Sequence, residues 1–280
     1  MATNPAPAQF HTLANGYTLQ FTDHAAASDE LGVVVFIHGS GPGASGWSNF
    51  KHNVAHFQNA GYRCIVYDQW GYGQSDKPTD VDHTLEFFVG GLVGLLDGLG
   101  IEKAHLVGNS LGGAVAIGAA LAHPGRVESL ILMAPGGIES RETYFAMPGI
   151  QAMVKYPMGS PEFTRDVLAK LLTQLVFDER QVDEELVSER WATLQTQNAH
   201  VLATMQIPDL SPRLAELTAP ILTFWGTDDR FCPAMGVWKV LSGAANVQAE
   251  LVNRCGHWVM SEYPDLFNRR CVDFLSHLPR

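Results

Sequence analysis

The stretch from Leu106 to Ala116, with the sequence LVGNSLGGAVA, constrains the fold of this chain most strongly. A short apolar run ends in the pattern Gly-x-Ser-x-Gly around Ser110, and small residues continue beyond it. The pattern predicts a strand, a sharp turn and a closely packed helix, with the serine backbone strained and the flanking glycines removing side chains that would clash. An ordinary tight turn into a helix is the alternative for so short a pattern. Only partner residues elsewhere in the chain can distinguish the two.

Buried strands alternate with helices on both sides of this stretch. Continuously apolar runs are typical of strands buried on both faces of a parallel sheet, and they predict strands at 33–37, 62–67, 105–109, 127–133, 221–225 and 247–252. A hairpin from Phe10 to His24, around the Asn15-Gly16 turn, adds an antiparallel edge. Helices are expected before Ala60, over 84–99, over 111–122, near Val237 and over 263–278. This alternation predicts an α/β fold with a mostly parallel, eight-stranded sheet and helices on both faces.

The alternation is interrupted between residues 138 and 208, where only helical periodicity is found. Ser160 and Pro161 are predicted to start one helix as its N-cap and first residue, and acidic residues at 183–185 start a second helix that carries Arg190. We therefore expect residues 1–137 and 209–280 to form one core domain and residues 138–208 to form an inserted helical lid.

Composition excludes several classes of partner and site. The 280 residues carry a formal charge of −11, so neither nucleic acid nor an anionic membrane would find a basic surface. Cys64, Cys232, Cys255 and Cys271 show no C-x-x-C spacing, which argues against a zinc site or a redox pair. Residues 1–9 lack the charged and apolar regions of a signal peptide, and no run is long enough to span a membrane. We expect free thiols, a cytoplasmic location, and neither metal nor cofactor.

Two later strands end in residues that could activate Ser110. A serine hydroxyl needs a base within hydrogen-bond reach and a third group that orients the base. Asp229 follows the strand at 221–225, and His257 follows the strand at 247–252. The chain order serine, acid, histidine, with each residue at a strand end, predicts a catalytic triad. Asp228 is the alternative acid. Cys232 and Cys255 are the alternative nucleophiles. Neither occupies a strand-to-helix turn, so we expect both to be buried without a catalytic role.

A glycine-rich loop, His38-Gly39-Ser40-Gly41, follows the first buried strand. Such a loop leaves backbone N–H groups uncovered near Ser110, where they can stabilise a developing oxyanion. We predict that the N–H groups of Ser40 and Leu111 form this oxyanion hole.

Four sequence blocks together resemble the meta-cleavage product hydrolases of the α/β-hydrolase superfamily. They are HGSGPGA with GWSN (38–49), GNSLGG (108–113), WGTDDRF (225–231) and CGHW (255–258), and the resemblance extends over nearly the whole chain. It implies cleavage of the C5–C6 bond of a 2-hydroxy-6-oxohexa-2,4-dienoate to 2-hydroxypenta-2,4-dienoate and a carboxylic acid, after enol-to-keto tautomerisation, in aromatic or steroid degradation. Attack by Ser110 and attack by water activated by His257 both stay open. The family pattern favours Asp229 over Asp228 as the acid, and implies no cofactor and a homodimer or larger homo-oligomer.

The resemblance also implies roles for residues outside the triad. Arg190 would pair with the substrate carboxylate, a task suited to a guanidinium group. Asn49, Asn109 and Trp258 would hold the dienol oxygens, and Gly41 is a further predicted substrate contact. Around the C6 substituent we expect Leu171 and Leu175, one helical turn apart on the same helix, together with Phe231 and Cys232. Cys232 stands where valine is frequent in relatives, and Val259-Met260-Ser261 replaces a frequent Ala-Gln-Trp. Methyl, phenyl, carboxyalkyl and seco-steroid groups all stay open at C6.

Two other functions use the same fold. A serine esterase or lactonase needs the triad but neither Arg190 nor Asn109. A ligand receptor with a moving lid can also keep a triad, although the glycine-proline-glycine loop and the CGHW block argue against it.

Overall fold

The structure is a computed structural model that describes residues 6–279. The strands of this part of the chain form one sheet. Its strands follow the order β1-β2-β4-β3-β5-β6-β7-β8. The pairs β1/β2 and β2/β4 are antiparallel, and the other pairs are parallel, as the sequence predicts. The strands are β1 (Gln9–Thr12), β2 (Thr18–His24), β3 (Gly32–Ile37), β4 (Tyr62–Tyr67), β5 (Ala104–Asn109), β6 (Val127–Met133), β7 (Ile221–Gly226) and β8 (Val247–Val252).

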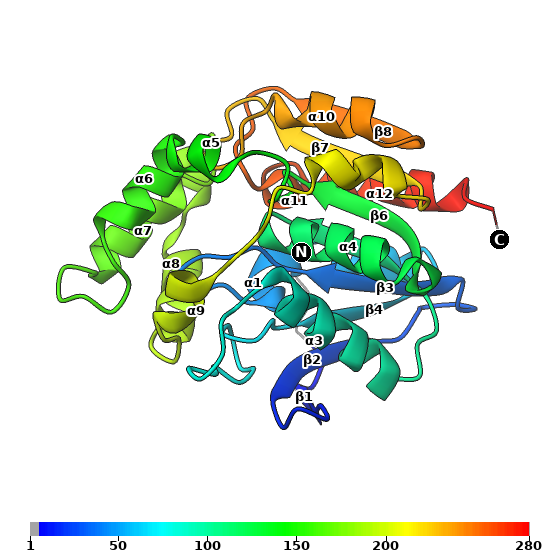
Figure 1. Ribbon diagram of the computed structural model, residues 1–280, viewed down its shortest axis with the longest axis horizontal. Helices are drawn as coiled ribbons and strands as arrows, with labels where there is room; N and C mark the ends of the chain where they lie inside the picture. The colour runs from blue at the N-terminus through cyan, green and yellow to red at the C-terminus, as the bar shows by residue number, and fades with distance from the viewer. Residues whose placement is uncertain (1–5, 280) are drawn as a thin grey trace.

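Helices cover both faces of this sheet (Figure 1). Leu106 and Leu132 point to the face covered by α3, α4 and α10, whereas Val107 and Ile131 point to the face covered by α1, α2, α11 and α12. Because successive side chains alternate between two buried faces, the central strands are apolar throughout. The helices are α1 (Gly46–Phe50), α2 (Val54–Asn59), α3 (Leu85–Gly98), α4 (Leu111–Ala122), α10 (Gly236–Gly243), α11 (Val259–Glu262) and α12 (Pro264–Ser276), with 3₁₀ turns η1 (Pro124–Arg126) and η3 (Ser211–Glu216).

The lid segment, defined here as residues 138–208, lies between β6 and β7 and gathers at one end of the sheet (Figure 1). Its buried residues Leu168, Leu171 and Val187 belong to the same apolar cluster as Val107 of the sheet, so the segment packs continuously onto the core. Its elements are α5 (Arg141–Phe145), α6 (Pro148–Lys155), α7 (Arg165–Thr173), η2 (Glu179–Gln181), α8 (Glu184–Leu194) and α9 (His200–Thr204). None of the helices within residues 6–279 combines the length and apolar character needed to cross a membrane.

One predicted helix start is wrong. Ser160 does not cap a helix, because the Phe163 N–H bonds to the Ser160 carbonyl in a turn and α7 begins only at Arg165. Thr164 is the N-cap: its side chain accepts from the Val167 N–H, and Asp166 lies in the first turn, where a carboxylate complements the helix dipole. The second predicted helix is confirmed as α8, with Asp183 as its N-cap.

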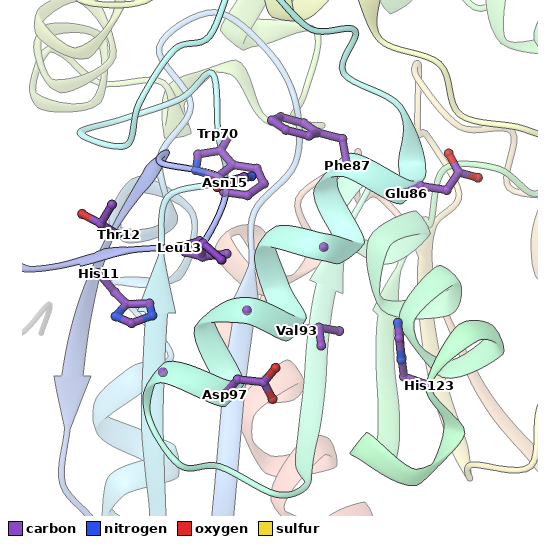
Figure 2. A pocket seen from close by; sticks show the side chains of 14 residues that line it. His11, Thr12, Leu13, Asn15, Trp70, Glu86, Phe87, Val93, Asp97 and His123 are labelled. Carbon is purple, nitrogen blue, oxygen red and sulfur yellow. The ribbon is translucent and has the colours of Figure 1, made fainter.

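A groove of about 610 Å³ lies between the β1–β2 hairpin and α3 (Figure 2). Leu13 and His11 of the hairpin approach α3 where it carries Gly94 and Gly98, and a Cβ atom at either glycine would collide with them. The glycines of α3 thus allow the edge hairpin to pack closely. None of the predicted site residues lines this groove.

The crossing of α4 over β3 should be intolerant of one added methyl group. A Cβ atom at Gly112 would collide with the carbonyl oxygen of Ile37, which is backbone and cannot move aside cheaply. We predict that Gly112→Ala lowers the free energy of unfolding by about 1–3 kcal/mol or more, measured by urea denaturation. Gly125→Ala is the matched control: a Cβ atom added there would meet no atom within 4 Å, so its effect should stay within about 0.5 kcal/mol. Equal effects of the two substitutions would contradict this explanation.

Candidate active site

Ser110 lies at the turn between β5 and α4 with φ +53° and ψ −116°, a backbone conformation that residues other than glycine rarely adopt. Its N–H donates to the Met133 carbonyl at 3.0 Å, and its own carbonyl accepts from the Gly136 N–H at 2.8 Å. A side chain at Gly108 would collide with the backbone of Gly112. The strained turn is therefore held by neighbouring backbone and depends on the two flanking glycines.

His257 and Asp229 form a buried pair. The His257 Nδ1–H donates to Asp229 Oδ2 at 2.7 Å, which leaves Nε2 as the ring nitrogen able to accept a proton. The other carboxylate oxygen, Oδ1, accepts from the N–H groups of Phe231 and Cys232 at 2.8 and 2.9 Å. Asp228 is exposed and accepts from the hydroxyl of Thr227. Asp229 is thus the carboxylate that orients the histidine.

Two neighbouring residues, Asn109 and Cys232, connect Ser110 to this pair. Asn109, which precedes it and is fully buried, donates through Nδ2 to the carbonyls of His257 and Met133, both at 3.3 Å. Burial raises the pKa of the Cys232 thiol well above its usual value, and the nearby Ser110 hydroxyl lowers it by less. Since a thiol held protonated is a poor nucleophile, Cys232 borders the site rather than competing with Ser110.

The glycine-rich loop after β3 runs against the turn. A Cβ atom at Gly39 would lie 2.9 Å from Asn109 Oδ1 and 3.2 Å from Ser110 Cβ. The loop therefore approaches Ser110 closely at Gly39, the residue just before Ser40. His38 anchors the loop: its Nδ1–H donates to the Gly39 carbonyl at 2.7 Å, and its Nε2 accepts from the Gln69 N–H at 3.0 Å. Burial lowers the pKa of His38 to about 4, so the ring is neutral at pH 7. The loop and the start of α4 are thus positioned for the predicted oxyanion hole of Ser40 and Leu111.

The lid segment holds the far end of this loop. Gln197 accepts through Oε1 from the Gly43 N–H at 2.7 Å and donates through Nε2 to the Gly41 carbonyl at 3.5 Å. Gly43 has φ +68°, and a Cβ atom there would collide with the backbone carbonyl of Arg190. Only glycine fits at position 43, because both the conformation and the approach of α8 exclude a side chain.

Arg190 is buried, with 3% of its surface exposed, and lies within a chain of polar contacts. Its Nη2 donates to Asn49 Oδ1 at 2.9 Å, and Asn49 Nδ2 donates to Asn109 Oδ1 at 3.4 Å. The guanidinium carbon lies 4.9 Å from the centre of the Trp258 ring. Within residues 6–279 no carboxylate forms an ion pair with Arg190, and its Nε atom has no hydrogen-bond partner. Burial lowers the pKa of Arg190 to about 10, which still leaves it charged at neutral pH.

The residues predicted around the C6 substituent fall into two groups. Phe231 and Cys232 lie beside the acid and base: both are buried, and the Phe231 ring centre is 5.3 Å from that of His257. Leu171 is buried in α7. Leu175 is not one helical turn further along the same helix, as predicted, because α7 ends at Thr173. Its carbonyl instead accepts from the His257 N–H at 2.8 Å.

Sequence reasoning missed Gln197, the Leu175 carbonyl and the anchoring role of His38. Gln197 acts on a residue 154 positions away in the sequence, and a backbone carbonyl such as that of Leu175 carries no side-chain signal at all. His38 precedes the glycines of a loop that the sequence does single out. An anchor for that loop is therefore the one missed role for which the sequence carries a signal.

Comparison with known proteins places this geometry in a family. The sequence profile of the Alpha/beta hydrolase family matches residues 34–270. The chain is 38% identical over 278 residues to a 2-hydroxy-6-oxononadienedioate/2-hydroxy-6-oxononatrienedioate hydrolase of Comamonas testosteroni, with 96% of each chain covered. It is 37% identical over 278 residues to a 2-hydroxy-6-oxo-6-phenylhexa-2,4-dienoate hydrolase of Burkholderia cepacia, again with 96% of each covered.

The fold agrees with a solved structure of the same kind. The meta-cleavage product hydrolase CumD from Pseudomonas fluorescens IP01 superposes with a TM-score of 0.82 at 26% sequence identity, covering 97% of this chain and 98% of that one. Fold and sequence thus agree. The chain belongs to the alpha/beta hydrolase family and, within it, to the meta-cleavage product hydrolases.

Proposed function

We propose that this protein hydrolyses the C5–C6 bond of a 2-hydroxy-6-oxohexa-2,4-dienoate, giving 2-hydroxypenta-2,4-dienoate and a carboxylic acid. The observation that carries the proposal is Arg190, a buried cation without a carboxylate partner among the described residues, connected through Asn49 and Asn109 to the turn at Ser110. A buried charge is costly unless it is paired. A substrate that brings a carboxylate into this position supplies the missing partner, and a simple neutral ester does not.

The proposed reaction uses Ser110, His257 and the predicted oxyanion hole. After the dienol has ketonised, the Ser110 hydroxyl attacks the C6 ketone while His257 takes its proton, and the oxygen that becomes negative is held by the N–H groups of Ser40 and Leu111. The C5–C6 bond then breaks, its electron pair goes to C5 as a conjugated dienolate, and the proton on His257 returns to that fragment. Water activated by His257 hydrolyses the acyl group to the carboxylic acid and frees Ser110. Direct attack by the same water on C6 uses the same groups.

Residues 138–208 act in this proposal as a lid that supplies Arg190 to the substrate. The four side chains assigned to the C6 substituent, Leu171, Leu175, Phe231 and Cys232, are uncharged. Because burying a carboxylate among uncharged side chains is unfavourable, they favour an uncharged C6 group.

We further propose that the enzyme is a cytoplasmic homo-oligomer. Four buried free thiols suit a reducing compartment, and the family resemblance implies at least a dimer. Sedimentation analysis of the purified chain measures the assembly directly.

The substrate class is tested by mixing the purified protein with yellow dienoates that carry methyl, phenyl or carboxyethyl groups at C6 and following the loss of colour. We predict that at least one is consumed, and that the uncharged substituents have the higher kcat/KM. Efficient turnover of p-nitrophenyl esters with no dienoate consumed would favour the esterase alternative. An esterase needs Ser110 and His257 but does not need Arg190.

Replacing the proposed nucleophile should separate binding from turnover. Ser110→Ala is expected to lower kcat by about 10³-fold or more while the dienoate still binds, because the hydroxyl is lost but the carboxylate contacts stay. A shift in the absorption spectrum of the dienoate on mixing measures binding, and product analysis measures turnover. Retention of most of the activity would remove Ser110 from the reaction.

Charge recognition by Arg190 can be isolated with a pair of substrates. Arg190→Ala should lower kcat/KM for the dienoate carboxylate by about 30-fold or more, since removal of one partner of a buried charge pair costs at least about 2 kcal/mol. The methyl ester of the same dienoate should lose much less, because it has no charge to pair. Arg165→Ala, which removes a lid arginine paired at the surface with Glu184, is the control. Equal losses for acid and ester would mean that Arg190 does not recognise the carboxylate.

A further inference from the structure

The loop that carries His257 is joined to the lid segment by the carboxylate of Glu262, a residue in α11 outside the predicted triad. Its Oε1 accepts from the Gly256 N–H at 2.7 Å, and the Cys255 thiol lies 3.6 Å from the same oxygen. Its Oε2 accepts from the Phe177 N–H at 2.7 Å, which belongs to the lid segment between α7 and η2. One side chain therefore bridges two backbone segments that are 79 residues apart in sequence.

The two segments also touch directly. The His257 N–H donates to the Leu175 carbonyl at 2.8 Å. A Cβ atom at Gly256 would lie 2.7 Å from that same carbonyl oxygen, so the approach is closer than any other residue type allows. The backbone position of the proposed base is thus defined by the lid segment on one side and by Glu262 on the other.

Both carboxylate oxygens of Glu262 accept hydrogen bonds from backbone N–H groups, and Oε1 also accepts from the Cys255 thiol. The side chain is buried, with 8% of the residue exposed, and no ion pair to it is found within residues 6–279. Burial raises the pKa of this carboxyl group, whereas the N–H donors of Phe177 and Gly256 lower it. Burying a carboxylate without a cation is unfavourable, and here the hydrogen bonds that offset the cost come from the loop around Gly256 and from the lid segment at Phe177.

We propose that Glu262 is a positioning residue for catalysis: by bridging the Gly256 and Phe177 N–H groups it fixes His257 relative to the lid segment, so that the imidazole is aligned with Ser110 only when the lid is docked. The proposal rests on the proposed function for the role of His257 as base. A misplacement of about 1 Å in a reacting group can lower the rate by about 10²-fold, so the bridge acts on kcat rather than on the carboxylate contacts that govern binding.

Two variants of Glu262 test the bridge in the full-length enzyme. Glu262→Gln keeps the length, but its Nε2 group then faces an N–H donor, so one of the two contacts is lost; Glu262→Ala loses both. We expect kcat for a consumed dienoate to fall about 10-fold and about 100-fold respectively, with KM changed by no more than about twofold. Asp265→Asn, three residues further on and exposed, is the matched control and should keep the wild-type kcat.

Phosphonylation of Ser110 by a fluorophosphonate separates positioning from folding. The final extent of labelling gives the fraction of molecules with a reactive Ser110, and the rate of labelling measures how well His257 activates that serine. Loss of structure alone would lower the number of sites and leave kcat per site unchanged, whereas we expect kcat per site and the labelling rate to fall together. A kcat per site in Glu262→Gln within about twofold of the wild type overturns the proposal. So does an equal loss in Asp265→Asn. If the wild type consumes no dienoate, the proposed function fails, and the labelling rates still decide the role of Glu262.

Discussion

Every part of the site depends on the strained backbone at Ser110. A positive φ at a serine costs of order 1–3 kcal/mol, which neighbouring contacts must offset. The offset comes from backbone that can approach because Gly108, Gly112 and Gly39 have no side chains. The same close packing brings the start of α4, the loop after β3 and the Asn109 amide to one place. Ser110 itself is half-buried, and the backbone on every side of it is held by these contacts.

The lid segment contributes to the site through its backbone as well as through Arg190. Gln197 holds the loop that contains Ser40, and the Leu175 carbonyl holds the His257 N–H. Residues outside the lid segment therefore supply the proposed nucleophile and acid, while the loop of the proposed oxyanion hole and the proposed base also contact the lid segment. In the proposed reaction, substrate recognition by Arg190 and alignment of the reacting groups therefore both depend on contacts with the lid segment.

The sequence predicts the sheet, its helices and the pairing of Asp229 with His257, because these follow from local patterns: apolar strands, glycines at a turn, and polar residues directly after strand ends. The role of Ser110 as their nucleophile stays a prediction. Prediction from sequence fails at Ser160, where Thr164 offers the better N-cap, and at Leu175, where the helix ends two residues earlier, at Thr173. Contacts such as Glu262 with Phe177 join distant segments through backbone groups. No pattern in side-chain type marks a backbone donor, so such contacts become visible only in three dimensions.

The collision that a side chain at Gly43 would make with the Arg190 carbonyl has a consequence for how enzymes of this kind can be recombined. Helix α8 and the loop after β3 are in direct contact at Gly43, so the shape of one cannot change without a matching change in the other. A chimaera that takes its lid from a relative with a differently placed α8 would leave a gap beside Gly43 or press on it. Substrate range should therefore be exchanged between relatives by moving both segments together.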